Sequence, residues 1–217
     1  MQELYTQTAS RVPSVEVTKV LRNTYALLGM TLTFAALMAG IAMAVNAPYM
    51  GLWMLLPYFV CVWMVEKNKN STAGLFWVFA LTGWLGFTTG PILSFYIGLS
   101  GMEPVLLALG GTALIFFALS GYILVTRKDM SFITGFMMTG LLVAFIAGIA
   151  SVFLNIPGLS LAVSCMFLVL SSLLIMWQTS RIIHGGETNY ISATVTLFVG
   201  LYNIFLILLS FLGGSNE

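Results

Sequence analysis

Long apolar segments separated by short polar connections fill most of the chain. A helix that crosses a bilayer needs about 20 mostly apolar residues, and seven segments have roughly this length. These segments are residues 25–45, 49–65, 72–96, 104–125, 131–154, 159–179 and 191–212. The pattern predicts an all-α membrane protein. We expect a seven-transmembrane helix bundle over residues 25–212, with a flexible tail before it (1–24) and a short tail after it (213–217).

Proline interrupts two of the predicted helices. The second segment is short and contains Pro57, so a kink or an extension beyond Glu66 is expected. The third segment contains Gly90 followed by Pro91, and a proline inside a helix removes one backbone hydrogen bond. We therefore expect a kink or a break here, which makes Gly90 and Pro91 candidate hinge positions.

Glycines recur within the predicted helices, and their usual role in membranes is to let two helices approach closely. The glycines in question are Gly83, Gly86, Gly90, Gly110, Gly111, Gly135 and Gly140. Close helix packing is the interpretation that we favour for all of them. A hinge, or the lining of a small cavity, is the alternative at Gly90.

The eight Lys and Arg residues occupy the N-terminal segment and alternate connections. Three precede the first predicted helix, and the other five lie in the connections 66–70, 126–130 and 180–190. Basic residues concentrate in the cytosolic connections of membrane proteins. The distribution therefore predicts a cytosolic N-terminus and a periplasmic C-terminus, which requires an odd number of spans.

Composition supports the membrane assignment and excludes other classes. Hydrophobic residues make up 59% of the chain and charged residues 7%, with a mean hydropathy of +1.02, whereas soluble domains carry about 25% charged residues. An ordinary soluble enzyme, a disordered chain and a collagen-like repeat are excluded. The net charge of +1 gives no indication of nucleic-acid binding. The lipid bilayer is the expected surrounding, and Cys61 and Cys165 are expected to be unpaired apolar residues.

Asp, Glu, Lys, Arg and His are absent from the middle of every predicted span. All seven acidic residues lie in tails or connections, whereas ion-coupled transporters usually place such groups within their spans. Ser120 would need a neighbouring base to act as a nucleophile, and the only histidine, His184, lies at the predicted cytosolic edge. The sequence therefore predicts no catalytic residue, no cofactor and no metal site.

Two amides, Gln178 and Asn203, fall within the predicted sixth and seventh helices. An amide inside a bilayer is expected to hydrogen-bond to a neighbouring helix. The alternative is that the two amides line a polar path across the membrane. Both interpretations stay open at this point.

Two polar connections are candidates for contact with a cytosolic partner. Arg127, Lys128 and Asp129 follow the fourth predicted helix, and His184 and Glu187 follow the sixth. These side chains are the chemically most varied ones on the predicted cytosolic side. We therefore take them as the candidate cytosolic contact.

Several residues of the same connections also fit helix ends. Gly185 suits the left-handed conformation that ends a helix, and Thr188 or Asn189 suits the N-cap of the last helix. Asp129 and Ser131 suit the start of the fifth helix in the same way. Helix capping is therefore the simplest interpretation of these polar residues.

The motifs of the chain resemble those of the Bax-inhibitor (transmembrane BAX inhibitor motif) family, and most closely its bacterial inner-membrane branch. The residues that carry the resemblance are LRNTY at 21–25, GPIL at 90–93, ALGGTA at 108–113, TRKDMSF at 126–132, HGGETNY at 184–190 and LYNIF at 201–205. The resemblance covers essentially the whole chain. It implies a bundle in which six helices surround a central seventh.

The resemblance also implies two candidate functions. The bacterial branch modulates the ATP-dependent membrane protease FtsH, so FtsH is an expected partner, together with its companions HflK and HflC. Other members of the family are calcium leak channels, gated by protonation of two facing aspartates in helices six and seven. Those two positions are Gln178 and Gly200 in this sequence. Because neither residue is an acid, the leak of calcium or protons is the weaker alternative.

Overall fold

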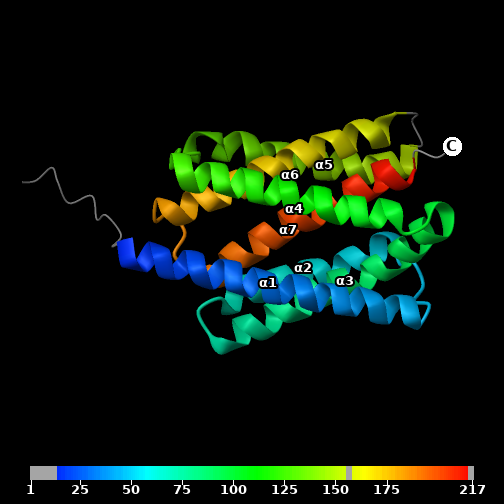
Figure 1. The fold of residues 1–217 in the computed structure, drawn as a ribbon, viewed down its shortest axis with the longest axis horizontal. Helices are drawn as coiled ribbons and strands as arrows, with labels where there is room; N and C mark the ends of the chain where they lie inside the picture. The colour runs from blue at the N-terminus through cyan, green and yellow to red at the C-terminus, as the bar shows by residue number, and fades with distance from the viewer. Residues whose placement is uncertain (1–13, 155–157, 215–217) are drawn as a thin grey trace, which may run out of the picture.

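The computed structural model describes residues 14–154 and 158–214, and these residues form helices and short connections (Figure 1). The helices are α1 (Ser14–Ala44), η1 (Gly51–Met54), α2 (Leu55–Asn68), α3 (Thr72–Ser100), α4 (Glu103–Thr126), η2 (Ser131–Ile133), α5 (Thr134–Leu154), α6 (Leu159–Ile183) and α7 (Tyr190–Gly213). The predicted all-helical fold is confirmed for this part of the chain. The C-terminal tail, residues 213–217, lies mostly outside the described residues.

Helix α7 occupies the middle of the bundle. It packs against α1, α2, α3, α4 and α6, and Figure 1 shows it running between α1 and α4. Its buried residues include Leu197, Phe198 and Ile204, which belong to the largest hydrophobic core. Helix α5 packs against α6 instead. The expected ring of six helices around a seventh therefore holds for five of them, with α5 in an outer position.

Six helical stretches of the described residues are long and apolar enough to cross a membrane. They are α1, α3, α4, α6, α7 and the stretch Ser131–Leu154, which joins η2 to α5. Helix α2 has 14 residues and extends past Glu66 to Asn68, as its sequence predicted. With η1 before it, the helical path covers residues 51–68. A seventh span through α2 stays a prediction.

The predicted flexible tail at residues 1–24 needs a correction, because α1 already begins at Ser14. Val20 is buried against Ile182 and Ala193, and the hydroxyl of Thr194 donates a hydrogen bond to the carbonyl oxygen of Thr24 at 3.2 Å. These contacts hold residues 14–24 in the helix. The segment before α1 is therefore limited to residues 1–13, which lie outside the described residues.

The predicted break at Pro91 is wrong, because this proline lies inside the continuous helix α3. Helix α1 packs closely along α3 just before it: a Cβ added to Gly90 would lie 2.5 Å from the Cβ of Ala42, and one added to Gly86 would overlap the backbone of Ala35. Close helix packing is confirmed at both glycines. A membrane helix tolerates proline where neighbouring helices surround it.

The other glycines divide into two groups. A Cβ added to Gly83 would meet the ring of Phe34, and one added to Gly140 would lie 2.8 Å from Leu170. The packing interpretation is therefore confirmed at these two positions. It is wrong at Gly110 and Gly135, where a Cβ would meet nothing within 4 Å. These two glycines face outward, because only one side of each helix faces the bundle.

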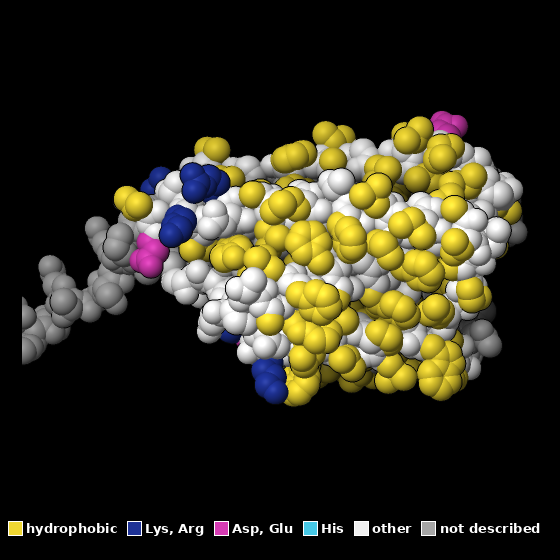
Figure 2. Space-filling view, turned by 90° about the horizontal axis from the view of Figure 1, so that it is seen from below, with side chains coloured by type: hydrophobic (Ala, Val, Ile, Leu, Met, Phe, Trp, Pro, Cys, Tyr) yellow, Lys and Arg dark blue, Asp and Glu magenta, His cyan; other side chains and the backbone are white. Residues whose placement is uncertain are grey.

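Charged and apolar side chains separate along the long axis of the molecule. Figure 2 shows hydrophobic side chains over the long face and Lys and Arg side chains at the end where α1 begins. Many large apolar residues of the spans are exposed, including Leu114 at 73% and Phe117 at 69%. We call the charged end the basic end. It is formed by the start of α1 and by the connections α2–α3, α4–α5 and α6–α7.

Candidate functional site

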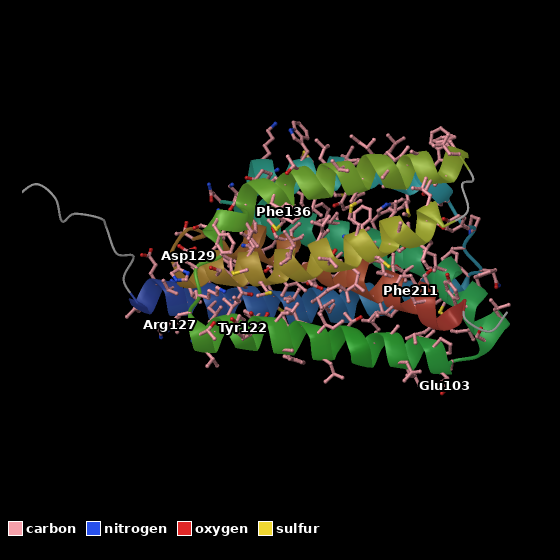
Figure 3. All side chains as sticks on the ribbon, turned by 90° about the horizontal axis from the view of Figure 1, so that it is seen from above. Glu103, Tyr122, Arg127, Asp129, Phe136 and Phe211 are labelled. Carbon is pink, nitrogen blue, oxygen red and sulfur yellow. The ribbon has the colours of Figure 1, made fainter. Side chains whose placement is uncertain are left out.

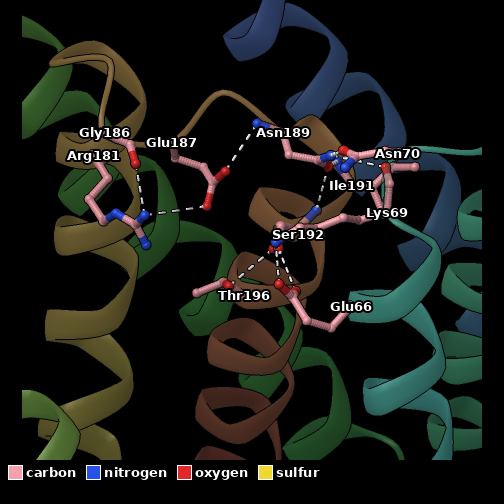
Figure 4. Close-up of polar contacts among 10 residues, drawn as sticks. All are labelled: Glu66, Lys69, Asn70, Arg181, Gly186, Glu187, Asn189, Ile191, Ser192 and Thr196. Atoms are coloured by element: carbon pink, nitrogen blue, oxygen red, sulfur yellow. Dashed lines mark hydrogen bonds and ion pairs between the residues drawn. The ribbon is translucent and has the colours of Figure 1, made fainter.

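The basic end brings together the connections that the sequence singled out. Figure 3 shows Arg127 and Asp129 at this end of the bundle and Glu103 at the opposite end. The α2–α3 and α6–α7 connections meet at the same end, where their polar side chains form the network drawn in Figure 4. We take the basic end, and the buried polar residues directly below it, as the candidate functional site.

Asn189 links two connections that are about 120 residues apart in the chain. Its side-chain oxygen accepts hydrogen bonds from the backbone N–H groups of Ile191 and Ser192, which confirms it as the N-cap of α7. Its Nδ2 donates to the carbonyl oxygen of Lys69 and to Oδ1 of Asn70, both at 2.9 Å (Figure 4). One amide therefore caps α7 and ties it to the α2–α3 connection.

Glu66 reinforces the same junction from the end of α2. Its carboxylate accepts a hydrogen bond from the ammonium group of Lys69 and another, at 3.1 Å, from the hydroxyl of Ser192. The hydrogen bond from Lys69 lowers the pKa of Glu66 below its ordinary value, and the bond from Ser192 acts in the same direction. Glu66 therefore stays ionised at neutral pH and can hold the start of α7.

Arg181 and Glu187 close the turn between α6 and α7. Their charged groups lie 3.7 Å apart, and Arg181 also donates a hydrogen bond to the carbonyl oxygen of Gly186 at 2.8 Å. The backbone N–H of Asn189 donates to Glu187 at 3.0 Å. Gly185 has a φ of 75°, so the predicted left-handed residue after α6 is confirmed. The turn is therefore fixed on both sides by side-chain contacts.

The α4–α5 connection lies against the end of α6. The hydroxyl of Ser180 donates to the carbonyl oxygen of Lys128 at 3.1 Å and accepts from the backbone N–H of Met130 at 3.0 Å. The same hydroxyl lies 3.3 Å from Nδ1 of His184. In the structure, the α4–α5 connection and His184 therefore both contact the hydroxyl group of Ser180. The sequence did not predict this shared contact.

The five predicted contact residues differ in exposure. Arg127, Lys128, Asp129 and His184 are exposed, whereas Glu187 is partly buried in its pair with Arg181. Asp129 accepts the backbone N–H of Ser131 at 2.8 Å, which lowers the pKa of Asp129. The N-cap of η2 is Met130, which makes no side-chain cap bond, so Asp129 bonds to the first residue of the helical stretch without being its N-cap. The four exposed side chains form the accessible part of the predicted set.

Gln178 lies below the basic end and is fully buried. Neither its nitrogen nor its oxygen has a hydrogen-bond partner among the described residues, so the predicted interhelical hydrogen bond is wrong at this position. The neighbouring Thr179 does connect helices, because its hydroxyl lies 3.5 Å from Tyr25 and 3.4 Å from Ser120. An unpaired buried amide costs about 1–3 kcal/mol, so Gln178 is an energetic outlier in the bundle.

Asn203 and Gly200 do not form a polar pair with Gln178. Asn203 is partly buried, and its side-chain amide makes no hydrogen bond to the part of the chain that the structure describes. Gly200 packs against Ile175, whose Cγ1 would lie 3.2 Å from a Cβ added to the glycine. On α6, Gln178 lies one helical turn beyond Ile175, toward the basic end. No continuous polar path joins these positions in the described residues.

Replacing Asn189 is expected to loosen the basic end. Asn189→Ala removes the cap of α7, worth about 1 kcal/mol, and two further hydrogen bonds, each worth about 1 kcal/mol. Asn189→Asp keeps the cap acceptor and loses only the amide donors, so its loss is expected to be about two-thirds as large. Unfolding of the purified chain in mixed micelles measures both losses. The exposed Thr188→Ala serves as control, and equal losses for the two Asn189 variants would contradict the capping role.

The fold and the site together define a polytopic helical membrane protein whose polar connections are organised at one end. Comparison with known families identifies it further: the family model described as "Inhibitor of apoptosis-promoting Bax1" matches residues 17–217. The chain therefore belongs to the Bax-inhibitor family.

Relatives within this family match the whole chain. The protein named "Modulator of FtsH protease YccA" from Escherichia coli strain K12 is 45% identical over 218 residues, which covers 100% of both chains. A protein named "Inner membrane protein YccA", from another Escherichia coli strain (O6:H1), has the same identity and coverage. An uncharacterized protein of Pseudomonas aeruginosa is 46% identical over 98% of this chain and 97% of its own length.

Proposed function

We propose that this protein resides in the bacterial inner membrane, where it binds the FtsH protease and restrains it. The observation that carries the proposal is the 45% identity, over the full length of both chains, to a protein named as a modulator of that protease. The extensive apolar surface along the bundle supports a position within the membrane. HflK and HflC are expected as further members of the same assembly.

The proposed orientation places the basic end in the cytosol. Its support is the gathering of Lys and Arg side chains at that end (Figure 2), since basic connections remain on the cytosolic side. A reporter fused after Glu217 is expected to be active only outside the cytosol, and one inserted after Arg127 only inside. A cytosolic C-terminus would contradict a seventh span through α2.

In the proposed mechanism the protease engages this protein readily but extracts it slowly. Extraction has to separate α7 from the five helices that pack against it. It must also unfold helices whose backbone groups cannot remain unpaired in lipid. A bound chain that resists extraction occupies the protease and slows the turnover of other substrates. The exposed side chains of Arg127, Lys128, Asp129 and His184 are the proposed contact surface.

Residues 1–13 are the proposed point of engagement, because they precede α1 on the proposed cytosolic side. Deleting residues 2–13 is expected to lengthen the lifetime of the protein in cells while α1 to α7 stay folded, since the deletion removes no residue of α1. Pulse-chase labelling measures this lifetime. A deletion of residues 2–20 is the comparison: it also removes Val20, whose burial against Ile182 contributes about 1.5–3 kcal/mol.

The two deletions separate recognition from stability. The shorter one is expected to give a longer-lived protein that restrains the protease more strongly, because the bound chain is no longer consumed. The longer one is expected to lower the thermal stability of the bundle. An unchanged lifetime after deletion of residues 2–13, in cells with active protease, would remove this segment from the mechanism.

The calcium or proton leak known from other family members is not part of the proposal. The two gating positions hold Gln178 and Gly200, and neither side chain titrates. Gly200 also packs against Ile175 with little space for a larger side chain. Gating by protonation at these two positions therefore has no chemical basis in this chain.

A further inference from the structure

Helix α2 and the short helix η1 before it form the shortest of the proposed membrane crossings. Their apolar part runs from Gly51 to Val65. With a rise of about 2 Å per residue in η1 and about 1.5 Å in α2, this part is about 24 Å long. The six stretches that are long enough by themselves have at least 24 residues each, or about 36 Å. The hydrocarbon layer of a bilayer is about 30 Å thick, so the α2 segment falls short of it.

One side of this segment is covered by the bundle, and the other side is exposed. Cys61 and Val65 are buried, and α2 packs mainly against α3. The exposed side is apolar from one end to the other; its large residues are Leu52, Trp53, Leu56, Phe59, Val60 and Trp63. In a membrane this side faces lipid. The lipid beside α2 therefore has to match the short apolar length of the segment.

A tryptophan lies toward each end of the exposed side. Trp53 is 76% exposed and Trp63 is 62% exposed, and they are about 15 Å apart along the helix at 1.5 Å per residue. The ammonium group of Lys67 lies 5.1 Å from the centre of the Trp63 ring. The indole N–H of Trp53 makes no hydrogen bond to the described residues. Tryptophan side chains collect at the two interfaces of a membrane, so these rings mark the two interfaces beside α2.

The connection from α1 to η1 also requires polar surroundings. Asn46 and Gly51 have φ values of 51° and 54°, so a continuous helix cannot pass through them. Between them, the backbone N–H groups of Tyr49 and Met50 make no hydrogen bond to the described residues. Irregular backbone that faces lipid does not occur within the hydrocarbon layer. Water and headgroups must therefore reach down to the start of η1.

The bundle holds α2 at a fixed height. At the end near η1, Nε1 of Trp84 on α3 donates a hydrogen bond to the carbonyl oxygen of Met54 at 3.0 Å. At the basic end, Glu66 accepts the hydroxyl of Ser192 at 3.1 Å. A short apolar segment is matched by bilayer thinning, by snorkelling of flanking charged side chains or by oligomerisation. Lys67 can snorkel at the basic end, but residues 45–54 contain no charged side chain.

We propose that the exposed side of α2 binds a locally thinned bilayer, in which headgroups of the leaflet opposite the basic end lie next to Trp53. The hydrocarbon layer beside α2 is then about 24 Å thick, roughly 6 Å thinner than an average bilayer. Most of the thinning falls in that leaflet, because Lys67 already reaches the interface at the basic end. The inference rests on the proposed span through α2 and does not depend on the protease.

Thiol labelling of the full chain in vesicles tests the proposal. In a background with Cys61→Ala and Cys165→Ala, single cysteines replace Leu52 or Leu109, and a water-soluble maleimide is present on both sides of the membrane. The two positions are exposed and lie 16 and 17 residues before the last residue of α2 and α4. In a bilayer of even thickness they would react alike. Leu52→Cys is expected to react at least about tenfold faster, because the reactive thiolate needs contact with water.

The length of the acyl chains separates a thinned bilayer from a water-filled crevice in the protein. Leu56 is 61% exposed and lies one helical turn beyond Leu52. The labelling rate of Leu56→Cys is expected to fall as the acyl chains are lengthened, because a thicker bilayer covers this position. Leu114→Cys is the control: Leu114 is 73% exposed and lies 12 residues before the end of α4, as Leu56 does in α2. It should stay unreactive in every lipid.

Two results would overturn the proposal. The first is equal labelling of Leu52→Cys and Leu109→Cys, which would mean that the bilayer is even or that a second copy of the chain covers α2. The second is a labelling rate of Leu56→Cys that does not change with acyl-chain length, which would place the water inside the protein. All substitutions are on exposed side chains or introduce alanine, and the unfolding midpoint of each variant in mixed micelles confirms its fold. Because no protease is present, a failure of the proposed function leaves these labelling rates unchanged.

Discussion

Replacing Gly86 with leucine is expected to separate α1 from α3 and to prevent stable folding of the bundle. A Cβ at this position overlaps the carbonyl oxygen of Ala35, and its nearest neighbours are all backbone atoms of α1. Backbone atoms cannot move aside as a flexible side chain does. Overpacking of a core costs about 1–3 kcal/mol, which is the loss expected for Gly86→Ala. Gly86→Leu should exceed it, because three further carbon atoms must enter the same contact.

The measurement is reversible unfolding of the purified chain in mixed micelles. Gly110→Leu is the matched control, because a Cβ at Gly110 meets nothing within 4 Å. It should be neutral or stabilising, since glycine lowers helix stability by about 1 kcal/mol relative to good helix formers. If Gly86→Leu were as stable as Gly110→Leu, the close approach of α1 and α3 would be absent.

Replacing Gln178 with leucine is expected to stabilise the protein, which is unusual for a buried polar position. The amide is fully buried, and neither of its polar atoms has a partner among the described residues. Leucine is apolar and of similar size, so the change removes the cost of an unpaired amide, about 1–3 kcal/mol. The free energy of unfolding should rise by roughly that amount. Gln178→Glu should instead destabilise the bundle at neutral pH, because a charge would be buried without a partner.

The Gln178 variants also bear on function. A buried polar residue that lowers stability and has no hydrogen-bond partner among the described residues is a candidate for a functional role, because departures of this kind concentrate at functional sites. If Gln178→Leu is more stable and restrains the protease less, the amide has such a role. A loss of stability in Gln178→Leu would show that the amide is satisfied in the membrane, and the assignment of position 178 as an energetic outlier would be withdrawn.

Much of the fold follows from the hydrophobic pattern. Helices α4 and α7 begin and end within one residue of their predicted limits, because polar connections bound their apolar stretches sharply. The start of α1 was missed because residues 14–24 are polar enough to resemble a tail. Val20 and Thr24, four residues apart, lie on the buried face of α1. That short buried stripe is a local signal that the helix begins earlier.

Contacts between distant segments account for what the sequence did not predict. Asn189 was foreseen as a cap of α7, since capping depends on neighbouring residues. Its bonds to Lys69 and Asn70 depend on how α2, α3 and α7 assemble, and no spacing in the chain encodes that. For the same reason the pattern did not separate Gly86, which contacts α1, from Gly110, which faces outward. Periodicity identifies a helix, but the partner of each face comes from the assembled bundle.

Reconstitution of FtsH with this protein tests the central claim most directly. Purified protease is placed in vesicles with a membrane substrate, and the initial rate of substrate degradation is measured as the amount of this protein is increased. The proposed function predicts that the rate falls and levels off once the protease is saturated, while the added protein is degraded more slowly than the substrate. A rate of substrate degradation that stays constant at every amount of added protein would contradict it.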